Sequence, residues 1–364
     1  MRGPSFPADS VTESQYPWLF SCRVDLLTFL GSAVLALGLL AAGAPLGLLN
    51  DDTPDWLWIG AVLMIDVAHV YATGFRVYFD REELSRRPWL YGLTPLLAFL
   101  IGWAIYSESH MAFWRILAYL AVFHFVRQQY GWVALYRSRG KENHDKLGWW
   151  IDAAAIYLAT LYPLLYWHAH LPRGFWWFLE GDFASLPITI VTVLAPVYWA
   201  ALATYAAHSI YRGVKRGQWN PGKDIVVATT AVCWYIGIVS FNSDYAFTVT
   251  NVITHGLPYM VLVYWYQAKK QATGENTANV SKSYSRLAIF LAVVWILAYF
   301  EELAWDCGYW HERSWLFGQQ WQLGRLESAL APLLAVPQIT HYVLDGFIWR
   351  RRENKDFEKM VPAE

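Results

Sequence analysis

The chain has 364 residues, of which 56% are hydrophobic and 16% are charged, and its formal net charge is -1. This composition is too apolar for an ordinary water-soluble domain of this length. The basic residues are spread over short segments and form no single basic face, which argues against nucleic-acid binding. Cys22, Cys233 and Cys307 stand singly, so there is neither a disulfide framework nor a CxxC metal or redox motif. We predict an all-α, polytopic membrane helix bundle.

The N-terminal segment, residues 1–24, is polar and lacks the basic start and early apolar run of a cleavable signal peptide. Beyond it, apolar windows of about 20 residues, long enough to cross a membrane, recur almost to the C-terminus. They predict about ten spans, near 25–48, 56–76, 89–107, 112–136, 148–168, 188–211, 225–241, 246–266, 287–306 and 327–349. We expect a cytoplasmic segment over 1–24, a single transmembrane domain over 25–349 and a cytoplasmic basic tail over 350–364.

Lys and Arg residues gather beyond alternate ends of the predicted spans. The clusters that follow the even-numbered spans begin at Arg76, Arg137, Arg212, Lys269 and Arg350. Because cytoplasmic loops of membrane proteins are enriched in Lys and Arg, this pattern places both termini in the cytoplasm. The two longest loops of the opposite side, 169–187 and 307–326, are rich in aromatic residues and could shape an entrance.

Histidines inside four predicted spans are the strongest functional signal. An ionisable group at bilayer depth is costly and marks a candidate site until a structural partner explains it. The four are His69, His124, His255 and His341, all in even-numbered spans. Counting residues to the first basic cytoplasmic residue, at about 1.5 Å each, puts them roughly 10 to 21 Å deep. They share overlapping levels, although depth alone does not place them side by side in the membrane plane.

The spacing of polar residues adds carboxylates to two of these histidines. Residues three or four apart share a helix face, which pairs Asp66 with His69 and Asp345 with His341. Neutral imidazole with carboxylate suits iron, zinc or copper, and the lack of a thiolate cluster argues against iron–sulfur. We favour one or two non-haem iron ions, with the metal ligands drawn from His69, His124, His255, His341, Asp66 and Asp345. For any single histidine, a structural pairing with a neighbouring group is an equal alternative.

Arg127 and Gln128 share the predicted face of His124 and are candidate catalytic residues. Arginine stays charged inside a protein and therefore needs an anion. Arg127 could pair with Asp66 or Asp345. Alternatively, it could hold the carboxylate or phosphate group of a substrate.

Other ionisable residues in the spans have ordinary explanations. Glu301 and Glu302 lie near the outer end of span nine, where side chains reach water by snorkelling, so they need no special role. His208 lies only four residues before Arg212 and is expected to be interfacial, which makes it a reserve ligand.

The runs Val122–Phe125 and Thr254–Met260 resemble the isolated-histidine helices of the bacterial and archaeal membrane-bound beta-carotene cleavage dioxygenases. The resemblance implies a multi-span protein, with His124 and His255 as iron ligands, and we expect it in the inner (plasma) membrane of a bacterium. It covers two short patches only. Val126 stands where that family has glycine, and Tyr259 stands where it has a second histidine, so the carotenoid substrate is not carried over. The chain lacks the HxxxH and HxxHH boxes of the membrane fatty-acid desaturases and hydroxylases.

These observations predict an integral membrane oxidoreductase, a non-haem iron oxygenase that acts on a membrane lipid or isoprenoid. The aromatic residues expected to orient the hydrocarbon are Phe123, Phe125, Tyr342 and Phe347. One alternative is a proton-coupled transporter that uses the same His and Asp residues as a relay, with Pro258 breaking a helix at the substrate site. Others are a b-type protein that binds haem through histidine pairs, and a purely structural membrane protein.

Overall fold

The computed structural model describes residues 16–272 and 280–361, and every regular element in these ranges is a helix. The predicted all-α class is therefore confirmed for the described part of the chain. The α-helices are α1 (Cys22–Asp25), α2 (Ser32–Gly43), α3 (Asp55–Leu57), α4 (Ala68–Arg76), α5 (Arg81–Arg86), α6 (Pro88–Glu108), α7 (His110–Arg139), α8 (Lys146–Ala169), α9 (Ile188–Arg216), α10 (Pro221–Trp234), α11 (Asp244–Phe247), α12 (Ile253–Ala272), α13 (Val280–Trp305), α14 (Ser314–Phe317), α15 (Glu327–Leu334), α16 (Val336–Ile348) and α17 (Lys355–Met360).

Several of these helices are joined end to end by π-helical segments. The π-helical segments are η1 (Leu26–Gly31), η3 (Trp58–Val67), η4 (Tyr235–Ser240), η5 (Thr248–Val252) and η6 (Asp306–Trp310). Short 3-10 helices form η2 (Leu48–Asn50), η7 (Gly324–Leu326) and η8 (Arg351–Glu353). π-Helical turns are rare and are found mostly at functional sites. Here η3 leads directly into α4 and η5 leads directly into α12, the two helices that carry His69 and His255.

Seven helices of the described residues are long and apolar enough to cross a membrane: Cys22–Gly43, Asp55–Arg76, Pro88–Glu108, Ile188–Arg216, Pro221–Ser240, Asp244–Gln271 and Tyr284–Trp310. Large apolar side chains also cover the outward faces of α9 and α13, where Val193 is 68% exposed and Ile289 is 61% exposed. In a water-soluble protein such faces would be buried, so they suit contact with lipid. These features are those of an integral membrane protein.

The other three predicted spans, 112–136, 148–168 and 327–349, are helical but do not belong to these seven. The first two coincide with the long helices α7 and α8. The last is not one helix, as predicted, but two, α15 and α16, divided at Ala335. Pro337 explains the division, because proline lacks the N–H that would continue the helix and its ring clashes with the preceding turn. The total of ten crossings stays a prediction.

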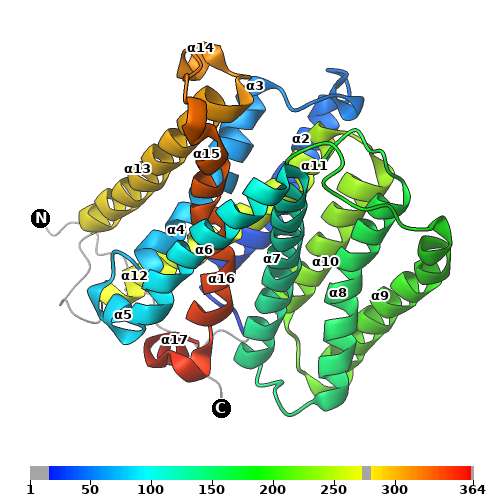
Figure 1. Cartoon of the computed structure of the whole chain (residues 1–364). Helices are drawn as coiled ribbons and strands as arrows, with labels where there is room; N and C mark the ends of the chain where they lie inside the picture. Colours follow the sequence, from blue (N-terminus) through cyan, green and yellow to red (C-terminus); the bar gives the residue numbers. More distant parts are fainter. Residues whose placement is uncertain (1–15, 273–279, 362–364) are drawn as a thin grey trace, which may run out of the picture.

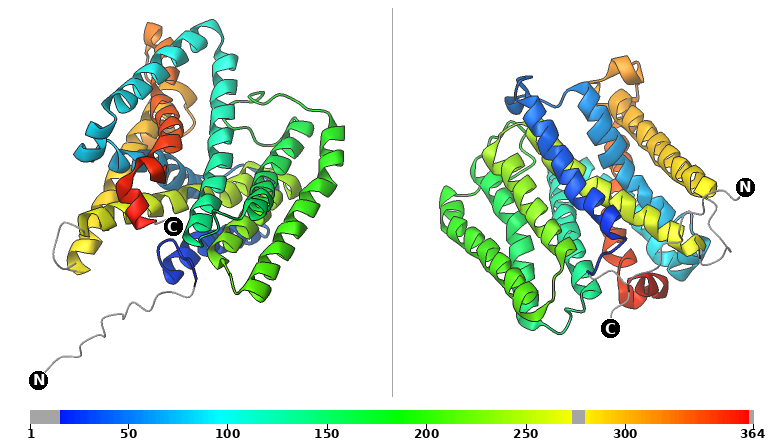
Figure 2. Two further views of the ribbon diagram at one scale, coloured as in Figure 1. Left: turned by 90° about the horizontal axis from the view of Figure 1, so that it is seen from below. Right: turned by 180° about the vertical axis from the view of Figure 1, so that it is seen from behind.

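The four histidine-bearing helices lie together in the middle of the bundle. α12 packs on α4, and α16 packs on both α4 and α7. Helices α8, α9 and α10 stand to one side of this group and α13 to the other (Figure 1). The view from behind shows α2 and α12 crossing the same central region (Figure 2). The site thus lies between the flanking helices.

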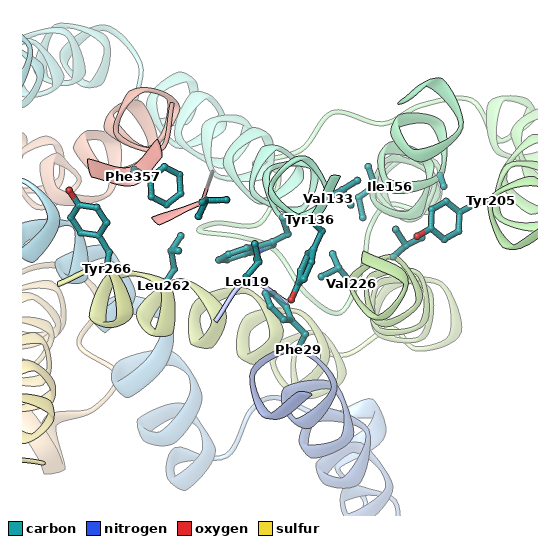
Figure 3. Close-up of a cluster of buried hydrophobic side chains, with 14 residues drawn as sticks. Leu19, Phe29, Val133, Tyr136, Ile156, Tyr205, Val226, Leu262, Tyr266 and Phe357 are labelled. Atoms are coloured by element: carbon teal, nitrogen blue, oxygen red, sulfur yellow. The ribbon is translucent and has the colours of Figure 1, made fainter. Parts of the chain in front are cut away.

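Both ends of the described chain pack onto the bundle. Leu19, Tyr136, Tyr266 and Phe357 meet in one apolar cluster that joins the N-terminal segment, α7, α12 and α17 (Figure 3). Phe357 is fully buried. The predicted basic tail is therefore not a loose extension over its described residues, because its aromatic side chain inserts between helices.

A buried network of charged residues ties together the ends of α7, α8, α9 and α10. Glu142 accepts hydrogen bonds from Arg212, from Asn220 at 2.8 Å and from Lys223 at 2.5 Å. Asp152 accepts from Arg137 and, at 2.9 Å, from Lys223. Because removal of one partner leaves a buried charge uncompensated, such networks are costly to break.

This network predicts a loss of stability in acid. Burial opposes ionisation of Glu142, but Lys223, Asn220 and Arg212 outweigh it and hold the pKa of the Glu142 carboxyl below its ordinary value of 4.5. A lowered folded-state pKa contributes stability that is present above the unfolded-state value and is lost as the pH falls through the folded-state value. Thermal unfolding in detergent should therefore show a midpoint that declines below about pH 4.5, and less steeply in Glu142→Gln. Equal slopes for the two proteins would contradict this.

Candidate metal centre

Four buried histidines from four separate helices meet at one point. His69 comes from α4, His124 from α7, His255 from α12 and His341 from α16. Their exposed fractions are 2%, 3%, 1% and 1%. The sequence placed these residues at overlapping depth but left open whether they were neighbours. In the structure they are.

The four imidazole rings follow one another around a closed circuit. Neighbouring ring centroids are 4.9 Å apart for His69 and His341, 4.5 Å for His341 and His124, 5.1 Å for His124 and His255, and 4.9 Å for His255 and His69. His69 and His124 lie opposite each other at 6.3 Å with nearly parallel rings. With a metal–nitrogen bond of about 2.1 Å, an imidazole centroid lies roughly 3.2 Å from the ion, so rings on opposite sides would be about 6.4 Å apart. The circuit has the dimensions of four imidazoles around one ion.

The donor nitrogens fit the same interpretation. His69, His124 and His255 each offer a ring nitrogen, and these three atoms all lie within 4.8 Å of one another. His341 is not part of this closest group of three, but its Nε2 lies 3.1 Å from Nε2 of His124. Adjacent ligands around a six-coordinate ion with bonds of about 2.1 Å are roughly 3 Å apart. The pair His124 and His341 therefore faces a common point at the spacing of two metal ligands.

His69 and His255 carry buried nitrogens that lack hydrogen-bond partners. Neither Nδ1 nor Nε2 of either ring is paired within the described residues. A buried polar atom left unpaired costs about 1–3 kcal/mol. A bound metal ion would satisfy one nitrogen of each ring, because an imidazole gives an ion a single nitrogen, so these atoms are better explained by a ligand than by packing.

Three polar side chains, those of Thr73, Tyr259 and Gln128, support the histidines through hydrogen bonds outside the circuit of rings. Thr73 Oγ1 lies 2.7 Å from Nδ1 of His341 and 2.9 Å from the Tyr259 hydroxyl. Gln128 donates from Nε2 to the backbone carbonyl of His255 at 2.9 Å. A partner on Nδ1 sets which nitrogen faces the centre, since the tautomer of a ligating histidine is decided by the hydrogen bond of its other nitrogen. The predicted site residue Gln128 thus contacts the cluster and holds α7 to α12.

Asp66 and Asp345, which were predicted as metal ligands, lie outside the circuit of rings, each next to one histidine. Asp66 Oδ1 is 3.6 Å from Nδ1 of His69, and Asp345 Oδ2 is 3.9 Å from Nδ1 of His124. Asp345 also accepts a hydrogen bond from Trp349 at 2.8 Å. Its nearest histidine is therefore on another helix and not His341, its predicted partner on the same face. At these distances the carboxylates can orient imidazoles that face the centre with Nε2.

Arg127 lies outside the cluster, contrary to the expected pairing with Asp66 or Asp345. Its side chain is exposed, donates to the Tyr157 hydroxyl on α8 and lies over the ring of Tyr130. Three residues of helix turn a side chain about 60° away from His124, which is enough to direct Arg127 toward the neighbouring helix. It contributes no charge to the centre. His208 is also remote, with Nε2 4.0 Å from Asp145.

A cavity of about 560 Å³ leads from exposed loops to residues that contact the histidines. Asp52 and Glu312 line it at the surface, whereas Asp66, Phe125 and Tyr342 line it beside the cluster. Phe125 stacks on His255 at 3.5 Å between centroids, and Tyr342 stacks on His124 at 4.8 Å.

Both long aromatic loops of the sequence contribute to this cavity, through Gly174–Glu180 and through Trp310, Glu312 and Arg313. Of the other aromatic residues expected to orient a hydrocarbon, Phe123 is 63% exposed and lies off the cavity, and Phe347 does not line it.

Sequence reasoning missed two acidic residues next to this cavity. Glu301 is only 5% exposed and Glu302 lines the cavity wall. They were expected near the end of a span that stops at 306, but η6 continues the helix to Trp310 and carries both residues further inside. The signal that could have found them is the adjacent pair of carboxylates within an otherwise apolar run.

Replacing Thr73 should weaken metal binding without removing a ligand. Thr73→Ala deletes the hydrogen bond to Nδ1 of His341, and changes of this kind cost about 10- to 100-fold in metal affinity. Thr73→Ser keeps the hydroxyl and should bind as the unaltered protein does. Competition with a chelator, followed by metal analysis, measures the difference. If the alanine and serine variants retain metal equally, Thr73 does not orient the ligand.

No protein-family model, curated protein or solved structure matches the chain significantly.

Proposed function

We propose that this protein is an integral membrane oxidoreductase, a non-haem iron oxygenase whose ion is held by His69, His124, His255 and His341. The observation that carries the proposal is the closed circuit of four buried imidazoles, two of which have no hydrogen-bond partner within the described residues. Nitrogen ligands with nearby carboxylates suit iron, zinc or copper. When bound, a ferrous ion supplies the capacity to activate dioxygen.

The protein's own residues would position the reactants. Phe125 and Tyr342 separate the cluster from the cavity and give a substrate an apolar surface beside the imidazoles. Asp66 lines the cavity and also lies next to the histidine cluster, and its carboxylate is the one nearest to His69. It can therefore hold or accept a proton at Oδ1, which has no hydrogen-bond partner within the described residues. The substrate we propose is a membrane lipid or isoprenoid.

In the proposed arrangement both termini lie in the cytoplasm of a bacterium, ten helices cross its inner membrane, and the cavity faces away from the cytoplasm. The basic residues that follow alternate helices support this orientation.

Oxygen uptake tests the proposed reaction. The purified protein, loaded with ferrous iron, is mixed with a lipid and isoprenoid extract, and oxygen consumption is recorded beside the His69→Ala variant. The proposal predicts uptake that needs both the extract and the intact histidine, with labelled oxygen found in a product. Loaded protein that consumes no oxygen with any fraction of the extract would overturn it.

A proton-coupled transporter is the second candidate, because the cavity reaches the carboxyl group of Asp66, which lies 3.6 Å from His69. It predicts solute-dependent proton movement in liposomes made with metal-free protein. A haem protein fits less well, since a porphyrin between any two of these imidazoles would occupy the space of the other two.

A further inference from the structure

The wall of the cavity is rich in carboxyl groups. Six carboxylates line it, namely Asp52, Asp66, Glu180, Asp244, Glu302 and Glu312. Arg313 is the single Lys or Arg among the lining residues that the structure describes, and it is already engaged with Glu312 at 3.0 Å and Asp55 at 3.7 Å. Carboxylates that share a cavity repel one another when ionised, and a bound cation relieves this repulsion.

A further carboxylate stands directly behind this wall. Glu301 is 5% exposed, and its Oε1 accepts hydrogen bonds from Trp305 at 3.3 Å and from Gln338 at 3.4 Å, both of which line the cavity. Its Oε2 has no hydrogen-bond partner within the described residues, and Oδ1 of Asp66 has only the longer contact of 3.6 Å with Nδ1 of His69. A cation bound in the cavity would add a favourable interaction with these two carboxylates.

The same wall is built to receive a cation on aromatic faces. Eleven of the 25 lining residues are aromatic. Trp114, Trp305 and Trp310 form a continuous indole wall, with centroids between 5.4 and 5.9 Å apart. Arg313 already demonstrates the contact, because its guanidinium lies 3.9 Å from the ring centroid of Trp58. Carboxylates combined with indole faces are the surroundings that recognise organic ammonium ions, more so than small hydrated metal ions.

We propose that this cavity binds an organic ammonium group, which is the polar end of the substrate of the histidine centre. The inference rests on the proposed function and narrows its substrate to a membrane-soluble molecule that carries an ammonium head. Glu302 and Asp66 compensate the charge, and Trp305 and Trp310 contact the head. A volume of about 560 Å³ suits a ligand of moderate size.

Binding of choline and tetramethylammonium to the purified, metal-loaded protein tests this inference. The control ligand is 3,3-dimethylbutan-1-ol, which has the shape of choline without its charge. Calorimetry or tryptophan fluorescence should show saturable binding of both cations and at least about tenfold weaker binding of the neutral alcohol. Glu302→Gln and Trp310→Leu should each weaken choline binding by about tenfold, which corresponds to about 1.4 kcal/mol of binding free energy. Glu108→Gln, at an exposed position off the cavity, should not.

Equal binding of choline and the alcohol would overturn the inference, because the cavity would then be merely apolar. Binding of magnesium without choline would do the same by assigning the carboxylates to an inorganic cation. Metal content measured on the same samples keeps the two proposals apart. Stoichiometric iron without choline binding defeats only the ammonium inference, whereas choline binding to a protein that takes up no metal defeats only the proposed oxygenase.

Discussion

The His124→Ala variant is expected to lose its bound metal and, with it, all oxygen uptake. His124 is central to the circuit because its ring contacts His255 and His341 and its Nε2 faces that of His341 at 3.1 Å. Losing a direct ligand should cost more than the roughly 10- to 100-fold in affinity that accompanies loss of an orienting partner. Metal analysis after gel filtration in detergent measures the effect.

A second buried histidine provides the matched control. His168 is 7% exposed, and its ring nitrogens already contact the Leu164 carbonyl and the Tyr119 hydroxyl, away from the cluster. His168→Ala should retain the metal although it also loses a buried ring. Arg127→Gln should retain it as well, because Arg127 lies outside the centre. Equal metal contents in the His124 and His168 variants would remove the basis for a specific site.

The Gly256→Ala variant is expected to disrupt the same site without replacing a ligand. A β-carbon at Gly256 would lie 2.8 Å from Ile65 Cγ2, 3.0 Å from the Ile65 carbonyl oxygen and 3.3 Å from Nδ1 of His69. The first two contacts are shorter than van der Waals distances allow, and a backbone atom cannot move aside cheaply. Helix α12 must therefore shift from η3 and carry His255 away from His69. We expect metal affinity to fall by at least about tenfold and the unfolding midpoint to drop, since overpacking costs about 1–3 kcal/mol.

Gly131→Ala is the control for the effect of a glycine-to-alanine change within a helix. Gly131 lies in α7 seven residues after His124, and a β-carbon there would meet nothing within 4 Å. Gly131→Ala should leave metal content unchanged and should not lower stability, because alanine is the better helix former. If Gly256→Ala behaves like Gly131→Ala in both measurements, close packing of α12 on η3 does not set the geometry of the centre.

The sequence predicts the histidines better than it predicts their surroundings. Their depth follows from counting residues along helices of known direction, and the cost of burying an ionisable group singles them out. That they are neighbours could not be predicted, because nothing in helix periodicity fixes positions in the membrane plane. Thr73 was missed as an orienting residue for the same reason, since its partners Tyr259 and His341 come from distant parts of the chain.

The errors have local physical causes. Arg127 was assigned to the face of His124 from spacing alone, yet the packing of α8 against α7 offers it a partner in Tyr157. Span ten was taken as one helix although Pro337 interrupts it. Glu301 and Glu302 were dismissed because a hydropathy window does not recognise that η6 prolongs the helix. π-Helical segments have no simple sequence pattern, so the faces they present cannot be counted from a period of 3.6 residues.

The central claim, a metal ion held by four imidazoles, is tested most directly by elemental analysis and an optical spectrum of the detergent-purified protein. The comparison is a variant in which His69, His124, His255 and His341 are all replaced by alanine, with His168→Ala as the control. We predict near-stoichiometric iron in the unaltered protein and in the control, and none in the fourfold variant. Absence of bound metal from the unaltered protein, also after incubation with ferrous iron, would contradict the claim.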